Sequence, residues 1–388
     1  MLDIGPIHRR EYEIAVGRSA DTVVIAQAPG RIHFLGEHGD PLAGLYLSAA
    51  IDRWIKVAVS PRRDNSLRFY AADLGERKRT TLANLKYKRE DRWANHIKAA
   101  IYLFSGLGVP MKGMNFTIIG NIPPQIGLGS SAAIEVAAAV ALREFLRVKI
   151  TDQELSRQLP AAHWAFFEEE SSPADYIIGL LARNNQFLII DESDMSVTKI
   201  KSPLSRSRII LMDSRVPRLG VEAELAARRE DLKNGLEMLS QGREGANFRE
   251  FATMDLMNSM GNLPEKIRHR SLHVVQEIRR VFDAGEYLLR ADIAGFSRLI
   301  FHSHESLRDL YEVSCPEIDW MVKRGQETIG VLGARMTGQG FGGSTYTIIK
   351  NEAVKEYRER LDDYERIFGF RPGIYEVKIA TGSKVVTG

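Results

Sequence analysis

Cysteine is nearly absent from this sequence, in which Cys315 is the only one among 388 residues. A single thiol excludes a disulfide within the chain, and a reducing, cytoplasmic compartment is the simplest expectation. No apolar run approaches the roughly 18 residues of a membrane span, and the N-terminus carries no signal-peptide core. We therefore expect no membrane association.

An excess of charge of one sign is also lacking. Lys and Arg together number 53 and Asp and Glu 50, which gives a net charge of +3, and no basic block stands out. Such a balance does not favour a nucleic acid or an anionic membrane as a partner. The expected ligands are small molecules.

The length of the chain and the order of its elements indicate two domains. A chain of 388 residues exceeds the usual size of one hydrophobic core. The polar segment at residues 199–205 reads as a boundary, so we predict one domain over residues 1–203 and another over residues 204–388. Strand and helix patterns mix without strict alternation, which favours an α+β architecture over a doubly wound sheet.

The most informative stretch is a glycine-rich loop at residues 122–133. It follows an apolar run at 116–119 that predicts a strand, and it opens a segment at 132–146 that predicts a buried helix. Glycines let the backbone approach an anion, and the first turn of a helix offers unpaired N–H groups, so the loop suits a phosphate. It has no lysine and is not a Walker A motif. A structural turn capped by serine is the alternative interpretation.

Two further stretches combine polar residues with glycine. Residues 28–40 place several ionisable side chains among glycines between two strand-like runs, a pattern typical of a solvated turn or of a site for a polar ligand. Residues 335–345 form a second glycine-rich loop before a β-branched strand at 346–349. Glu135 is nearly alone among apolar neighbours on the predicted central helix, and we expect it to be a buried, hydrogen-bonded group.

The remaining patterns predict strands and helices along the whole chain. A helical arm is expected over residues 1–22. Strands are expected at residues 23–26, 47–51, 54–60, 186–191, 209–212 and 373–379. Helices are expected at residues 92–103, 152–169 and 352–364, with a mostly helical stretch from 221 to about 324.

Taken together, these motifs resemble the GHMP kinase superfamily and, within it, the galactokinases. Residues 30–40 look like the galactokinase signature, residues 127–133 like the family phosphate loop, and residues 336–344 like the third motif. Residues 306–317 also read like a galactokinase segment. The resemblance implies an N-terminal domain similar to ribosomal protein S5 domain 2 and a ferredoxin-like C-terminal domain. It also implies ATP- and Mg²⁺-dependent phosphorylation of the anomeric hydroxyl of a sugar.

The resemblance further assigns roles to single residues. It implies that Asp175 is the catalytic aspartate and that Arg31 neutralises phosphoryl charge and restrains Asp175. Without the resemblance, Asp175 would be one acid in an acidic patch. The residues implied to bind the sugar are Glu37, His38 and Asp40. Those implied to bind the nucleotide are Gly127, Leu128, Gly129, Ser130, Ser131, Ala132, Gly340 and Gly342, with Ser130 also implied as the Mg²⁺ ligand.

The sequence departs from the galactokinase pattern on the sugar side. Residues 41–44 differ from the usual Tyr-Asn-Gly-Gly, and Leu225 stands where a tyrosine normally contacts the sugar. A pocket that loses a polar contact loses discrimination for that hydroxyl. The sequence therefore leaves several interpretations open. The substrate is galactose, another aldose or a uronic acid, or the protein is a galactokinase-like sugar sensor.

The implied metal site departs as well. The usual second Mg²⁺ ligand is a glutamate about a dozen residues before the catalytic aspartate, and here that position is His163. Either one of Glu168, Glu169 and Glu170 replaces the missing glutamate, or the metal is held more weakly.

Overall fold

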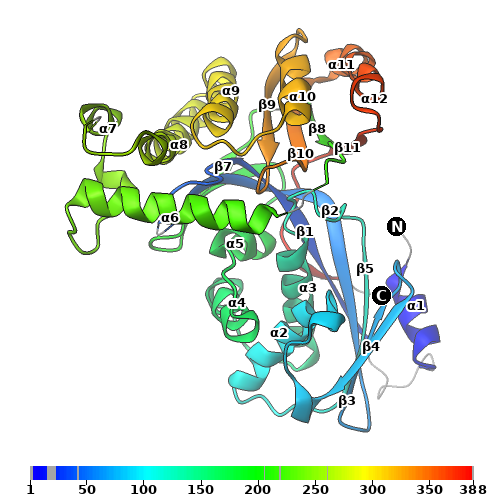
Figure 1. Ribbon diagram of the computed structural model, residues 1–388. Helices are drawn as coiled ribbons and strands as arrows, with labels where there is room; N and C mark the ends of the chain where they lie inside the picture. Colours follow the sequence, from blue (N-terminus) through cyan, green and yellow to red (C-terminus); the bar gives the residue numbers. More distant parts are fainter. Residues whose placement is uncertain are drawn as a thin grey trace.

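The computed structural model describes residues 3–14, 23–41, 43–204, 206–217, 220–259 and 261–386. In this part of the chain the strands form two sheets, and helices pack against both of them (Figure 1). The mixed order of strands and helices confirms the predicted α+β class. Among the helices described, none combines the length and apolarity needed to cross a membrane.

The first sheet is built around a long ribbon of two antiparallel strands. These are β1 (Val24–Leu35) and β2 (Leu45–Pro61), which pair over most of their length. Within the described ranges the sheet has eight strands in the order β12-β1-β2-β5-β3-β4, with β6 paired to β2 and β7 to β6. The other strands are β3 (Ser66–Ala71), β4 (Glu76–Thr81), β5 (Met114–Gly120), β6 (Gln186–Asp191), β7 (Ser196–Lys201) and β12 (Lys384–Val386).

Helix α3 (Ser130–Phe145) is the central helix on this sheet. It packs on β1 and β2 and touches the neighbouring helices α2 and α5. Its alanine-rich sequence is buried along nearly its whole length, and small side chains let a helix lie close to a sheet. The surrounding helices are α1 (Ile4–Glu11), α2 (Ala94–Gly106), α4 (Asp152–Phe167) and α5 (Pro173–Leu181).

The second sheet has four antiparallel strands among the residues described, in the order β11-β8-β10-β9. They are β8 (Ser207–Asp213), β9 (Val331–Thr337), β10 (Ser344–Lys350) and β11 (Gly373–Val377). The helices of this half are α6 (Val221–Ser240), α7 (Thr253–Asn258), α8 (Glu265–Leu289), α9 (Ile293–Asp309), α10 (Pro316–Gln326), α11 (Val354–Leu361) and α12 (Asp363–Phe368). α9 and α10 pack on β9, while α8 also reaches β2 and β7 and so joins the two halves.

Most predicted elements are confirmed, with instructive exceptions. The predicted strands at 47–51 and 54–60 are one strand, β2. Asp52 and Arg53 form a bulge opposite Pro29 and Gly30, and this bulge explains why the sequence pattern is interrupted there. The predicted helix at 352–364 is divided into α11 and α12. Strands β3, β4, β7, β9 and β12 were not predicted, and the loop predicted at 335–345 begins within β9. β4 and β7 are rich in polar residues and lack the apolar alternation that marks a strand, whereas β3 has that alternation and was missed.

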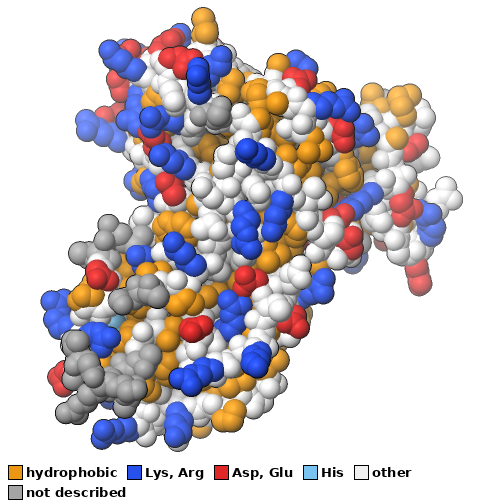
Figure 2. Space-filling view, turned by 180° about the vertical axis from the view of Figure 1, so that it is seen from behind, with side chains coloured by type: hydrophobic (Ala, Val, Ile, Leu, Met, Phe, Trp, Pro, Cys, Tyr) orange, Lys and Arg blue, Asp and Glu red, His pale blue; other side chains and the backbone are white. Residues whose placement is uncertain are grey.

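The ends of the chain differ in part from the prediction. The helical arm predicted for residues 1–22 has α1 within it, and residues 1–2 and 15–22 lie outside the described residues. Strand β7 ends at Lys201 and β8 begins at Ser207, so we propose that the boundary between the domains lies between them. β12 returns to the first sheet and pairs with β1. On the face seen in Figure 2, basic side chains are interspersed with acidic ones.

A buried cluster of charged side chains connects the two halves. Arg335 on β9 is fully buried and donates to Glu37, which follows β1, with an N–O distance of 2.8 Å. Its guanidinium also lies 3.5 Å from Glu277 on α8. Glu277 in turn accepts from Arg280 at 2.6 Å and from the backbone N–H of Gly36 at 2.8 Å. Burial alone would raise the pKa of Glu277, but the charges of Arg280 and Arg335 outweigh it and lower that pKa to about 2.

We expect Arg335→Ala to destabilise the protein by about 3–5 kcal/mol, because the substitution leaves Glu37 buried without its cation and takes one of two neighbouring cations from Glu277. Urea unfolding, followed by both circular dichroism and tryptophan fluorescence, measures the change. The folded-state pKa of Glu277 is depressed from its ordinary 4.5 to about 2. The stability that ionised Glu277 contributes is therefore present above pH 4.5 and is lost as the pH falls toward 2. The difference in unfolding free energy between Arg335→Ala and the unchanged protein should become smaller in acid.

Arg366→Ala is the matched control for this experiment. Arg366 pairs with Asp363 on the surface and its side chain is 78% exposed. Exposed pairs of this kind contribute about 0–1 kcal/mol. An Arg335→Ala deficit no larger than that of the control would show that the buried cluster does not stabilise the fold.

Candidate functional site

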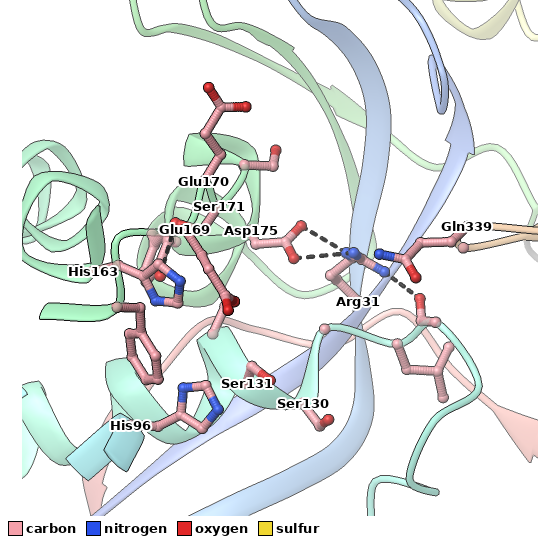
Figure 3. A pocket seen from close by; sticks show the side chains of 18 of the residues that line it. Arg31, His96, Ser130, Ser131, His163, Glu169, Glu170, Ser171, Asp175 and Gln339 are labelled. Carbon is pink, nitrogen blue, oxygen red and sulfur yellow. Dashed lines mark hydrogen bonds and ion pairs between the residues drawn. The ribbon is translucent and has the colours of Figure 1, made fainter. Parts of the chain in front are cut away.

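A cavity of about 780 Å³ contains most of the residues predicted from the sequence. Its walls come from β1, the loop before α3, the segment that joins α4 to α5, and the second glycine-rich loop (Figure 3). The predicted residues that line it are Arg31, Glu37, His38, Gly127, Leu128, Gly129, Ser130, Ser131, Ala132 and Asp175.

An ion pair between Arg31 and Asp175 lies at the centre of this cavity. Arg31 donates from Nε to Oδ1 of Asp175 at 2.7 Å and from Nη2 to Oδ2 at 3.0 Å. It also donates to the carbonyl of Gly127 in the glycine-rich loop (Figure 3). Burial alone would raise the pKa of Asp175, but the charge of Arg31 and a hydrogen bond from His33 hold it well below its usual range. Asp175 is therefore ionised throughout the neutral range.

His33 is a site residue to which the sequence analysis gave no role. Its Nε2 lies 3.0 Å from Oδ1 of Asp175, and its Nδ1 lies 2.6 Å from the hydroxyl of Ser48. Burial and the neighbouring Arg31 lower the pKa of His33, so the ring is neutral. An ionised carboxylate only accepts, so Nε2–H donates to Asp175 and Nδ1 accepts from Ser48. Residues 28–40 were not predicted to be a strand. In a strand every second side chain lies on the same face, so this alternation would have placed His33 on the face of Arg31.

The glycine-rich loop brings backbone N–H groups to the cavity. Gly129, in the left-handed region at φ 70°, is the N-cap of α3, so the first turn of that helix opens onto the cavity. A Cβ at Gly129 would lie 3.4 Å from Oδ2 of Asp175. Gly127 and Gly338 also touch, because a Cβ added to Gly127 would meet Cα of Gly338 at 2.7 Å. The two glycine loops are therefore packed backbone against backbone.

The three residues predicted to bind the sugar differ in their environments. Glu37 lines the cavity, but its carboxylate accepts from Arg335 and from the backbone N–H of Gly338. His38 lines the cavity with a buried Nε2 that has no hydrogen-bond partner among the described residues. Burial lowers the pKa of His38 to about 4, so its ring is neutral. Asp40 is buried outside the cavity lining and accepts from the backbone N–H of Phe248 at 2.9 Å.

Three other predicted positions lie away from the cavity lining. A Cβ at Gly340 would meet the carbonyl of Val313 at 2.4 Å, and one at Gly342 would meet Val216 at 2.8 Å. These glycines permit tight packing of the third motif, while Gly338 and Gln339 of the same motif do line the cavity. Leu225 is buried on α6 and is not part of the lining.

Oxygen donors suited to Mg²⁺ are present in the cavity. The hydroxyls of Ser130 and Ser131 line it, together with the carboxylates of Glu169 and Glu170. Glu168 ends α4 in the left-handed region at φ 57° and is not part of the lining. His163 is engaged with Glu135, which confirms that Glu135 is a buried, hydrogen-bonded group.

A second, more apolar cavity of about 560 Å³ lies against the same loop. Ser130 and Ser131 contribute to both cavities. Its other walls are mostly aliphatic and aromatic, including Leu74, Trp93, Ile118, Ile122, Pro123 and Ile134. A flat apolar group joined to a phosphate chain could therefore span the loop from one cavity to the other.

Comparison with known proteins identifies the family. The chain matches the galactokinase galactose-binding signature over residues 10–61, the GHMP kinases N terminal domain over 95–182 and the GHMP kinases C terminal model over 286–365. It is 37% identical to a putative galactokinase of Treponema pallidum, covering 100% of this chain and 97% of that protein. It is 33% identical to a galactokinase of Roseiflexus sp., covering 98% and 97%.

A solved structure agrees with this family assignment. The structure of Lactococcus lactis galactokinase complexed with galactose matches with a TM-score of 0.90 at 25% identity, covering 98% of this chain and 99% of that one. The predicted two-domain GHMP kinase fold is thereby confirmed. With the galactokinase signature, the two GHMP kinase domains and full-length likeness to these relatives, the chain belongs to the galactokinase family of the GHMP kinases.

Proposed function

We propose that this protein transfers the γ-phosphoryl group of ATP to the anomeric hydroxyl of galactose or of a closely related sugar. The observation that carries the proposal is the ion pair of Arg31 and Asp175, which lies in a cavity at the N-terminus of α3. Phosphoryl transfer needs positioning and charge neutralisation more than covalent help. An anion site, a cation and an orienting carboxylate in one cavity meet that need.

Asp175 orients the sugar hydroxyl in this proposal. Its Oδ1 already accepts from Arg31 and His33, whereas Oδ2 accepts only from Arg31 among the residues that the structure describes. Oδ2 is therefore the oxygen with capacity left for the substrate O–H. The sugar oxygen forms its bond to phosphorus as the bond to ADP breaks, and the proton passes to Asp175. A carboxylate with a low pKa is a weak base, so this transfer accompanies or follows the loss of ADP.

The nucleotide is placed by the two cavities on either side of the phosphate loop. The triphosphate lies against Gly127, Gly129 and the first turn of α3, where N–H groups and the helix dipole favour negative charge. The apolar cavity next to Trp93 takes the adenosine. Mg²⁺, when bound to ATP, neutralises phosphate charge, and the oxygens of Ser130 with Glu169 or Glu170 fit that hard cation.

The sugar lies beside Asp175 on the side of the signature residues. The unpartnered Nε2 of His38 is suited to a sugar hydroxyl, because a buried polar atom gains from such a partner. Glu37 holds the third motif in place through Gly338 and can accept a further hydroxyl. Asp40 supports this end of the cavity through Phe248.

The experiment that tests the function is ATP consumption with Mg²⁺ across free sugars. The panel contains galactose, arabinose, galactosamine, galacturonate and glucuronate, and mass spectrometry and NMR identify the product. We expect a sugar 1-phosphate from galactose or one of its analogues. ATP binding without turnover of any sugar would overturn the kinase proposal and favour a sugar-sensing role.

We expect Asp175→Asn to lower kcat by roughly 10²–10⁴-fold, the range of a positioned acid–base group. Binding of ADP, measured by calorimetry, should stay close to that of the unchanged protein. Asp309→Asn is the control, because Asp309 pairs with Arg308 on an exposed part of α9. Turnover by Asp175→Asn equal to that of the control would remove Asp175 from the proposed role.

His33 is expected to act as a positioning residue. A hydrogen bond to a charged group contributes about 1.5–3 kcal/mol, so His33→Ala should lower kcat by roughly tenfold or more with little change in the KM for ATP. His33→Asn keeps a donor and should restore part of the rate. His302→Ala, at an exposed position of α9, controls for the loss of an imidazole. Equal rates for His33→Ala and His33→Asn would contradict the positioning role.

A further inference from the structure

Two imidazoles converge on one carboxylate in the wall of the main cavity. Nδ1 of His96 lies 2.7 Å from Oε1 of Glu135, and Nδ1 of His163 lies 2.8 Å from the same oxygen. Glu135 is buried and carries its other oxygen, Oε2, 2.8 Å from the hydroxyl of Tyr176. An ionised carboxylate oxygen can accept two hydrogen bonds, and Oε1 therefore brings two imidazole nitrogens to one point.

The three side chains come from three packed helices. His96 lies on α2, Glu135 on α3 and His163 on α4, and α2 packs against both of the other helices. The ring of Phe167 stacks on the ring of His163 at 4.4 Å and lies 5.0 Å from that of His96. Side chains mounted on helices and held by packing keep a fixed geometry, which a metal site needs.

The cluster is accessible from the cavity that the phosphate loop forms. His96, His163, Tyr176 and Phe167 line this cavity together with Ser131. Figure 3 shows His96 and His163 on the same side of the cavity as Ser131 and Glu169. An ion bound by the cluster would therefore have open coordination positions toward the cavity.

The chemistry of the three donors selects a class of metal. Two imidazole nitrogens and one carboxylate oxygen are typical ligands of Zn²⁺ and of other first-row divalent ions. Mg²⁺ prefers oxygen ligands only. The hydrogen bond from Tyr176 then holds the ligand carboxylate from outside, as is usual around metal sites.

We propose that His96, Glu135 and His163 form a binding site for a divalent first-row transition metal, with Zn²⁺ and Co²⁺ as its chemical type. Nδ1 of each imidazole and Oε1 of Glu135 are the ligands, and water or a phosphate oxygen completes the coordination from the cavity. Neutral imidazoles bind the ion through Nδ1 by moving their proton to Nε2. Its ligands differ from the oxygens that the proposed function assigns to Mg²⁺, and its binding of a metal ion can be tested without that function.

The test is titration of the chelator-treated, tag-free full chain with Co²⁺ and with Zn²⁺, in the absence of ATP and sugar. Strong visible absorption of Co²⁺ reports a four- or five-coordinate site in place of the hydrated ion, and calorimetry gives the stoichiometry for Zn²⁺. We expect one ion per chain, and at least about tenfold weaker binding in His96→Gln and in His163→Gln. His269→Gln, on the exposed face of α8, is the matched control and should bind as the unchanged protein does. Mg²⁺ at equal concentration should not compete.

Two results would overturn the site. One is the absence of stoichiometric binding, and the other is binding that His96→Gln and His163→Gln leave unchanged. If either variant fails to fold, a crystal of the unchanged protein soaked in Zn²⁺ decides the matter. Anomalous density between the three ligand atoms supports the proposal, and anomalous density only elsewhere refutes it. Because no kinase assay enters, a failure here is distinct from a failure of the proposed function.

Discussion

The buried ion pair between Glu37 and Arg335 is the interaction on which the arrangement of the site depends. Its two residues come from opposite halves of the molecule, and Glu37 also accepts from the backbone of Gly338. Through these contacts the end of β1 holds the third motif against the phosphate loop. Charges that are buried and paired tolerate little displacement, because separating them leaves each charge buried without a partner. The charge cluster therefore holds the walls of the cavity in their positions.

The charge state of Asp175 depends on the side chains that β1 presents to the cavity. Bulges in the pairing of β1 with β2 set the side chains of Arg31 and His33 on the face toward α5. Asp175, in the first turn of α5, then receives donors from both of them. The carboxylate is kept ionised and oriented, and Arg31 reaches the phosphate loop from the same position. The site therefore favours precise positioning over strong basicity, which suits phosphoryl transfer.

Helix α3 serves two parts of the cavity at once. Its first turn presents N–H groups at the phosphate loop, and Glu135 lies about one and a half turns further along, facing His96 and His163. A shift of this helix would therefore disturb both the anion site and the histidine cluster. The dense packing of alanines against β1 and β2 resists such a shift, since close-packed interiors transmit strain.

The sequence by itself determined the α+β class, the strand, glycine loop and helix around residues 116–146, and the burial of Glu135. These are local properties, because apolar periodicity and glycine placement act over a few residues. The roles of Asp175 and Arg31 came from family resemblance. The tertiary structure shows the contact of Arg31 and Asp175 across 144 residues that the resemblance implied. Only the tertiary structure placed His33 beside them and joined three helices at Glu135. Strand bulges and helix packing decide such contacts, and neither leaves a periodic signal in the sequence.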